Sequence, residues 1–208
     1  MAEIAVDYLV VGAGASGMAF VDTLIDHADV SVALIDRRHG AGGHWLDAYP
    51  FVRLHQASAF YGVASTLLGR GQLQTHGPEK GMHERATGPE VAAYYARVLE
   101  RLTDSGKVQF FPACNYLGNR RFVSLLSGRQ YAVSDQTRVV DARYLSPDIP
   151  ARTPAPFGVT DGARVIPVNA LAQVVDAPSQ YVIVGAGKTA TDAAGWLLEN
   201  GVDPGAIC

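Results

Sequence analysis

Cysteine is scarce in this chain of 208 residues, which contains only Cys114 and Cys208. The two lie far apart and in no CxxC or metal-ligand spacing, so the sequence predicts neither a disulfide framework nor a metal site. Cys114 has no basic neighbour in sequence, and we expect it to be a buried, inert thiol. This cysteine usage is typical of a cytoplasmic protein.

Long apolar runs and an excess of charge of one sign are also missing. No stretch reaches the roughly 18 apolar residues of a membrane span. The net charge is −3 and is mixed along the chain, so there is no basic footprint for nucleic acid. The first strand pattern begins almost at once, which leaves no room for a signal peptide. We therefore expect a small-molecule substrate and no nucleic-acid or membrane partner; the oligomeric state stays open.

The first informative motif is a glycine-rich turn near the N-terminus. Residues 8–11 form a short apolar run, Gly12, Gly14 and Gly17 fill the three slots of G-x-G-x-x-G, and a helical pattern follows from Ser16. The glycines allow a tight strand-to-helix turn, close approach of a pyrophosphate and close helix packing. The helix N-terminus offers N–H groups to phosphate. A bare glycine turn is the alternative interpretation.

An acidic residue lies where such a site needs one. The strand pattern VSVALID ends at Asp36, nineteen residues after Gly17, where a carboxylate can accept hydrogen bonds from a ribose hydroxyl. The alternative is a solvated aspartate at the end of a strand, beside Arg37 and Arg38. We favour dinucleotide binding.

A second fingerprint lies close to the C-terminus. A strand is expected over residues 181–184, followed by a turn and a helix that ends at Gly201. Its candidate pyrophosphate-binding residues are Gly185, Gly187, Lys188, Thr189 and Ala190. Two such motifs predict one FAD site and one NAD or NADP site, with hydride passing from NAD(P)H to the flavin.

The segment after Asp36 is rich in aromatic and histidine side chains. It contains G-G-x-W at Gly42, Gly43 and Trp45 and suits a flat, partly apolar ligand, although ordinary core packing is the alternative. Together with the first fingerprint, this segment resembles the FAD domain of two-dinucleotide-binding-domain flavoproteins, in particular flavin-containing and Baeyer–Villiger monooxygenases.

The resemblance implies further contacts with the cofactor. Tyr49-Pro50 and Arg53 match the segment that lies along the flavin in those families, while His55 replaces its acidic residue. Dithiol chemistry of the disulfide-reductase type is excluded here because no cysteine precedes Cys114. The candidate residues of the first site are Gly12, Gly14, Ala15, Ser16, Gly17, Asp36, Arg37, Gly43, His44, Trp45, Arg53 and His55.

The middle of the chain completes an α/β pattern. Residues 66–89 read as a polar surface excursion, and a helix opens at Pro89-Glu90 and stops at Gly106. Strands are expected within 107–118, 120–128 and 129–135 as a meander, and again near 138–142. The fold class is a Rossmann-like FAD-binding domain with a parallel sheet and a β-meander, followed by the start of a second Rossmann-like domain.

Two departures from the family pattern stand near the domain boundary. Arg143 and Tyr144 occupy the usual Thr-Gly of a segment that otherwise matches the end of the first FAD half. The Baeyer–Villiger signature F-x-G-x-x-x-H-x-x-x-W is not found, so that activity is disfavoured. We expect an FAD domain over 1–150, a proline-rich linker over 151–178 and a truncated NAD(P) domain over 179–208.

The residues favour an FAD-dependent, NAD(P)H-using oxidoreductase of monooxygenase-like type, active in a longer parent of roughly double this length. No residue qualifies as a catalytic acid, base or nucleophile. One rival is an FAD-dependent reductase without oxygen insertion. The other is a nucleotide-binding fragment without activity of its own.

Overall fold

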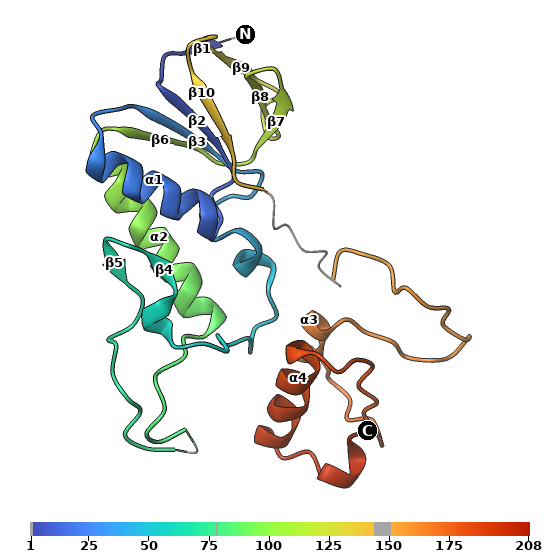
Figure 1. Cartoon of the computed structure of the whole chain (residues 1–208). Coiled ribbons are helices and arrows are strands. Elements are labelled where there is room, and N and C mark those ends of the chain that lie inside the picture. The colour runs from blue at the N-terminus through green and yellow to red at the C-terminus, as the bar shows by residue number, and fades with distance from the viewer. Residues whose placement is uncertain (1, 78, 144–150) are drawn as a thin grey trace. The chain divides into compact units, whose positions relative to one another are not determined.

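The computed structural model describes residues 2–77, 79–143 and 151–208. Among these, the chain forms two compact units (Figure 1). The first unit contains the residues up to 46 and those from 54 to 143, and the second contains 47–53 and 151–208. The short segment 47–53 thus packs with residues that lie more than a hundred positions later, which the sequence did not predict.

A parallel sheet forms the centre of the first unit. Its strands run in the order β10 (Arg138–Asp141), β2 (Tyr8–Val11), β3 (Val32–Ile35) and β6 (Val108–Phe111). All four residues of β3 are buried, as expected for an apolar strand covered on both faces. The strands expected after the first fingerprint and near 138–142 are confirmed.

Two helices in contact with each other belong to the same unit, and they pack against one face of the sheet (Figure 1). They are α1 (Ala15–His27) and α2 (Gly88–Asp104). In α2, Thr87 and Glu90 form a capping box, which satisfies N–H groups of the first turn. The buried face of α2 has the predicted helical spacing, so the helix expected from Pro89 is confirmed: Val91, Tyr94, Tyr95, Val98 and Leu102.

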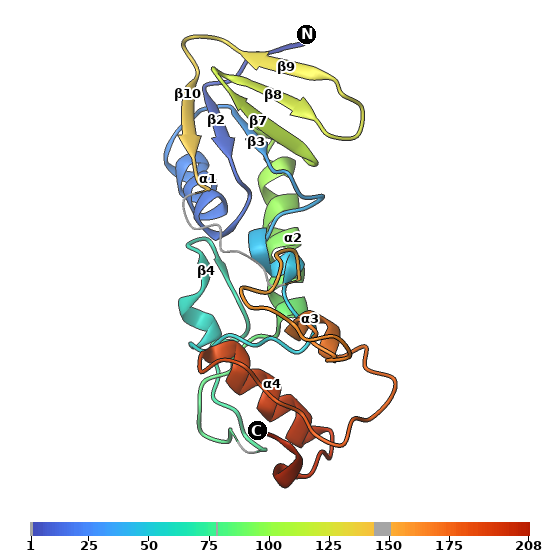
Figure 2. The same cartoon turned by 90° about the vertical axis from the view of Figure 1, so that its right-hand side faces the viewer.

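A second sheet covers the other face. It has the order β1 (Ala2–Ile4), β9 (Gln130–Val133), β8 (Arg121–Ser124) and β7 (Cys114–Gly118), and β7 to β9 lie side by side in Figure 2. The single strand expected within 107–118 is in fact two. The chain turns at Ala113, whose φ is +48°, so β6 joins the parallel sheet and β7 joins the meander.

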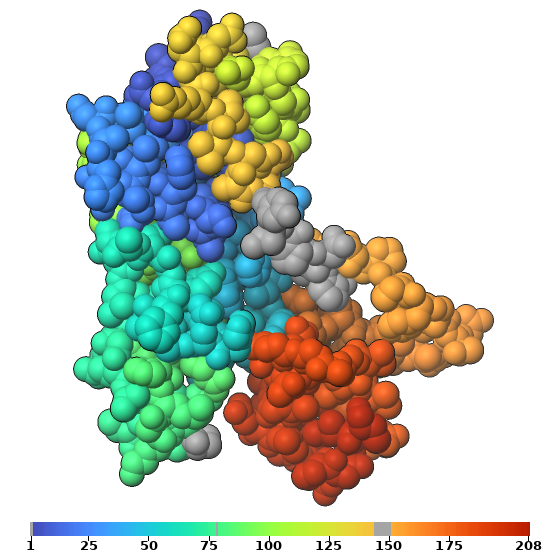
Figure 3. Space-filling view, viewed as in Figure 1, coloured from blue at the N-terminus to red at the C-terminus, as the bar shows by residue number. Residues whose placement is uncertain are grey.

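Short elements connect these layers. They are the 3₁₀ turns Gly43–Asp47 and Ser58–Phe60 and the hairpin of β4 (Gly62–Val63) with β5 (Thr66–Leu67). Strand β4 contacts α1, and the two segments share one face of the first unit in the space-filling view (Figure 3). The predicted surface excursion over 66–89 is largely exposed in its described part.

The second unit is built around α4 (Lys188–Glu199), with the short helix α3 (Val168–Leu171) and a 3₁₀ turn over Pro204–Ala206. Residues 181–184 were expected to form a strand, but in the described chain they form only a bridge from Tyr181 to Ile207. Val182 and Val184 are 69% and 77% exposed, because a strand needs paired neighbours to bury its side chains. The expected domain boundary at residue 150 lies outside the described residues.

Candidate dinucleotide-binding site

The first glycine turn has the geometry that its sequence requires. Gly12 connects β2 to α1 with a φ of +106°, a backbone conformation that is strongly unfavourable for residues other than glycine. A Cβ atom on Gly17 would lie 1.8 Å from the Gly12 carbonyl oxygen, so α1 can sit this close to β2 only with glycine at both positions. The bare-turn interpretation explains these two glycines but not Gly14, which has an extended backbone that any residue could adopt.

Gly14 faces a second glycine from a distant part of the chain. A Cβ atom on Gly43 would lie 2.9 Å from the Gly14 Cα, and Gly43 itself has a φ of +59°. The Gly42 N–H donates to the Ala13 carbonyl at 2.8 Å and holds the two loops together. The loops therefore form a cradle without side chains at the start of α1.

The N-terminus of α1 opens onto this cradle. Gly14 is the N-cap, and no described side chain caps the helix or places an acidic group in its first turn. The N–H groups of Ala15, Ser16 and Gly17 are among the first-turn donors that a helix cannot satisfy internally. Such donors, together with the helix dipole, suit an anionic group such as a pyrophosphate.

Asp36 lies beside the same turn. It is 6% exposed, its Oδ2 accepts from the Ala13 N–H at 2.7 Å, and its Oδ1 accepts from the Arg38 N–H at 2.8 Å. The solvated-aspartate alternative is thus wrong for this residue. Each carboxylate oxygen keeps further lone pairs with which it could accept a ribose hydroxyl. Arg37, the next candidate, is exposed.

Trp45 is fixed by hydrogen bonding and ring packing in the turn after Gly43. Its indole Nε1 donates to the Tyr61 hydroxyl at 2.6 Å, and the two rings meet edge to face with centroids 5.8 Å apart. His44 stacks on Trp45 at 5.4 Å. Behind them, the Tyr95 hydroxyl is buried and has no hydrogen-bond partner in the described chain. Burial, with Tyr61 nearby, raises the pKa of Tyr95 well above its usual range.

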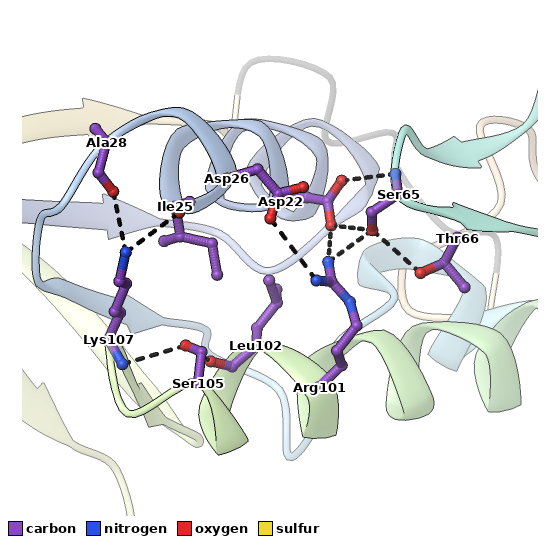
Figure 4. A network of polar contacts seen from close by, with 10 residues as sticks. All are labelled: Asp22, Ile25, Asp26, Ala28, Ser65, Thr66, Arg101, Leu102, Ser105 and Lys107. Atoms are coloured by element: carbon purple, nitrogen blue, oxygen red, sulfur yellow. Dashed lines mark hydrogen bonds and ion pairs between the residues drawn. The ribbon is translucent and has the colours of Figure 1, made fainter.

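A network between α1 and α2 holds the hairpin that follows Tyr61 (Figure 4). Asp22 is fully buried, and its carboxylate accepts from Arg101 and from the Ser65 hydroxyl, the latter at 2.6 Å. Tyr94 adds a second attachment, since its hydroxyl accepts from the Val63 N–H at 2.8 Å. These contacts fix the position of Tyr61 at the start of the hairpin and, through it, Trp45.

Arg143, which the sequence analysis named only as a departure from the family pattern, lies at the first glycine turn. Its side chain passes 3.3 Å from the position of a Cβ on Gly12 and makes two hydrogen bonds with the Asp141 carboxylate, at 2.9 and 2.8 Å. This pairing lowers the pKa of Asp141. The signal in the sequence was a cation two residues after the last residue of β10. Tyr144, the other departure from the family pattern, lies outside the described residues.

The second glycine turn resembles the first in its backbone. Gly185 has a φ of +141°, Gly187 is the N-cap of α4, and the Ala190 Cβ lies 3.8 Å from the position of a Cβ on Gly185. A small side chain at residue 190 therefore suffices for packing. Lys188 is not free at this turn, since its ammonium binds the Asp192 carboxylate and the Arg53 carbonyl.

The structure brings five of the candidate residues of the first site together. Gly12, Gly14, Gly17, Asp36 and Gly43 meet around one turn of the first unit. Arg53 belongs to the second unit and His55 to the first, and both side chains are exposed.

In the part of the chain that the structure describes, no three His, Cys, Asp or Glu side chains gather to hold a metal ion. No helix among the described residues is long and apolar enough to cross a membrane. Cys114 is buried, and burial raises the pKa of its thiol, which keeps it in its less reactive form.

Comparison with known sequences identifies part of the chain and its relatives. Residues 10–63 match the family described as NAD(P)-binding Rossmann-like domain. "Uncharacterized protein Rv2000" of Mycobacterium tuberculosis (strain H37Rv) is 46% identical over 202 residues, which are 97% of this chain and 37% of the relative. "Uncharacterized protein Mb2023" of Mycobacterium bovis gives the same values. The chain therefore spans 37% of the length of these curated relatives.

Comparison with solved structures extends the likeness to the fold. Cyclohexanone monooxygenase with bound ε-caprolactone superimposes with a TM-score of 0.53 and 18% identity, over 94% of this chain and 38% of that one. A mutant cyclohexanone monooxygenase from Rhodococcus sp. Phi1, bound to NADP+, gives 0.51 and 20%, over 94% and 37%. Residues 10–63 therefore match an NAD(P)-binding Rossmann-like domain, and the chain shares its α/β fold with cyclohexanone monooxygenase, as the resemblance predicted.

Proposed function

We propose that this chain supplies the FAD site and the start of the NAD(P) site of a flavin-dependent oxidoreductase that takes hydride from NAD(P)H. The observation that carries the proposal is the close approach of Gly43 to Gly14 beside Asp36 and the N-terminus of α1. A turn needs no second glycine loop packed against it, whereas a pyrophosphate needs backbone without side chains. The fold shared with cyclohexanone monooxygenase supports the same proposal.

The residues present fit FAD in four ways. The N–H groups of Ala15, Ser16 and Gly17 would bind the pyrophosphate, and Asp36 would accept the ribose hydroxyls. The Cγ of Arg143 would flank the turn at Gly12, while Asp141 holds the guanidinium of Arg143. Trp45, fixed by Tyr61, would flank the flavin together with Gly43 and His44. When bound, the flavin supplies the redox chemistry by accepting hydride.

The second turn would receive the nicotinamide cofactor. Gly187 leaves room for the pyrophosphate, because, apart from its chain neighbours, no described residue has a heavy atom within 4 Å of the position its Cβ would take. We keep the expected domains, with FAD binding over 1–150, a linker over 151–178 and NAD(P) binding over 179–208. A monooxygenase-like reaction is proposed for the whole protein. The present chain spans 37% of the length of its curated relative.

The test is retention of FAD, with Gly14→Ala as the decisive variant. The new Cβ would be 3.6 Å from the Gly43 Cα, an ordinary contact, and the Gly14 backbone is extended, so the fold should tolerate it. The same methyl would occupy the path of the pyrophosphate. We expect flavin absorbance bands to survive desalting in the wild type, and the variant to bind FAD at least about tenfold more weakly.

Gly40→Ala is the matched control, because the nearest atom to its new Cβ lies 3.9 Å away and outside the cradle. Equal FAD affinity of Gly14→Ala and Gly40→Ala would rule out this site. If the wild type remains colourless after incubation with FAD, the chain alone is not a flavoprotein. Oxygen uptake with a hydroxylated product, measured on a longer form of the protein, separates a monooxygenase from a reductase.

A further inference from the structure

Segment 47–53 contacts the rest of the second unit at several points. The Phe51 ring stacks on Trp196 of α4 with centroids 4.8 Å apart and an interplanar angle of 18°. The Asn169 side chain donates to the Asp47 carbonyl at 2.9 Å. The chain neighbours of this segment, residues 43–46 and 54–56, include the candidate flavin contacts His44, Trp45 and His55. The segment is therefore covalently continuous with the proposed flavin residues and in non-covalent contact with α4.

Lys188 joins this segment to the first turn of α4. Its ammonium binds the carbonyl of Arg53, the last residue of the segment, and the carboxylate of Asp192. The Tyr49 hydroxyl donates to the same Asp192 oxygen at 2.6 Å, and Lys188 Nζ lies 5.9 Å from the Tyr49 ring centroid. Burial and the neighbouring Asp192 carboxylate raise the pKa of Tyr49, so the hydroxyl stays protonated as a donor.

The helix by itself gives no reason for a lysine at this position. Lys188 is the first residue of α4, where a positive charge opposes the helix dipole. A lysine four residues before an acidic residue is also the less favourable order of such a pair. A residue that contradicts its local structural preference is expected where function requires it. Lys188 directly follows Gly187, the proposed approach point of a pyrophosphate.

We propose that Lys188 is shared between segment 47–53 and the pyrophosphate of the nicotinamide cofactor. This inference rests on the proposed NAD(P) site. A pyrophosphate at the turn competes with Asp192 and the Arg53 carbonyl for one ammonium group, because charge-assisted bonds to phosphate are strong. Its capture of Lys188 loosens the end of segment 47–53. Nucleotide binding at the second site thereby alters residues adjacent to the proposed flavin contacts.

The two tryptophans of the chain allow a direct test. In a Trp45→Phe background, Trp196 is the remaining tryptophan and reports on its stacking with Phe51. Titration with NADP+ and, separately, with inorganic pyrophosphate is followed by Trp196 emission and acrylamide quenching, and NADP+ binding by calorimetry. We expect both ligands to shift the emission to longer wavelength and to increase quenching.

Variants at Lys188 identify its part in the response. Lys188→Met should show the shifted emission without ligand, give no further change, and bind NADP+ about tenfold more weakly. Lys188→Gln keeps a hydrogen-bond donor but no charge and should behave in the same way. It takes the place of Lys188→Met if that variant folds poorly. Lys188→Arg should retain the response, since it keeps the cation.

Each outcome has a distinct meaning. NADP+ binding in calorimetry with unchanged Trp196 emission and quenching would overturn the shared-lysine proposal and leave the NAD(P) site intact. A full response in folded Lys188→Met or Lys188→Gln would also overturn it. Absence of NADP+ binding would overturn the NAD(P) site and this inference together.

Discussion

Gly43 lies so close to Gly14 that a Cβ atom on Gly43 would come within 2.9 Å of the Gly14 Cα. The contact joins the first glycine turn to the loop that carries G-G-x-W. Glycine at residue 43 is therefore required twice, by the contact and by its φ of +59°.

Gly43→Ala should lower the free energy of unfolding by about 3 kcal/mol, because the methyl group clashes with backbone and the residue has a positive φ. Gly40→Ala, in the same loop, should change it by less than about 1 kcal/mol. Urea denaturation followed by circular dichroism measures both. Similar values for the two variants would show that the loops do not need their close approach.

Glycines inside the two fingerprint helices should respond in opposite directions. In α1, Gly17→Ala places a Cβ 1.8 Å from the Gly12 carbonyl and should cost about 3 kcal/mol of stability or more. In α4, no described residue beyond the chain neighbours and the helix's own nearby backbone has a heavy atom within 4 Å of the Gly195 Cβ position, and Gly195→Ala should stabilise the helix by about 0.5–1 kcal/mol. Thermal unfolding of both variants checks the signs, and a stable Gly17→Ala would contradict the packing of α1 on β2.

The buried Asp22 carboxylate should destabilise the fold when its ion-pair partner, the Arg101 side chain, is removed. Arg101→Met leaves a buried carboxylate without its cation and should lower the free energy of unfolding by about 2–3 kcal/mol. The loss is smaller than for a fully buried ion pair because the Arg101 side chain is 40% exposed. Arg97→Met, also on α2 but exposed, should change it by less than about 0.5 kcal/mol.

The double variant Asp22→Asn/Arg101→Met tests whether the loss comes from this pair. The amide needs no cation and can still accept from Ser65, so the two substitutions together should cost less than the sum of their separate effects. Strict additivity in chemical denaturation would show that the two side chains act independently.

Acid should weaken the first unit partly through Asp141. Its hydrogen bonds with Arg143 lower its pKa below the ordinary value of 3.8, so the folded form binds a proton less readily than the unfolded form. The stabilisation is fully present above pH 3.8 and is lost as the pH falls through the lower, folded-state value. Unfolding measured between about pH 6 and pH 2 should show a smaller acid loss for Asp141→Asn than for the wild type.

The structure also shows where local reasoning succeeds. Gly12 and Gly17 are readable because the turn and the helix packing that require them lie within a few residues. Helix α2 follows from the helical spacing of Val91, Tyr94 and Val98 and from the expected opening at Pro89-Glu90, and the structure adds the cap at Thr87. The segment 181–184 has the composition of a strand, but a strand also needs neighbours, and in the described chain only one bridge supports it.

By itself, the sequence determined the two glycine turns, the α/β pattern, the acidic end of β3 and the resemblance to two-domain flavoproteins, because each is encoded in a short window. Only the tertiary structure decided that Gly43 meets Gly14, that Arg143 lies against Gly12, and that Tyr49 bonds Asp192, 143 residues away. The path of a loop depends on what its distant partners bury and bond. No periodicity or spacing within the loop itself records those partners.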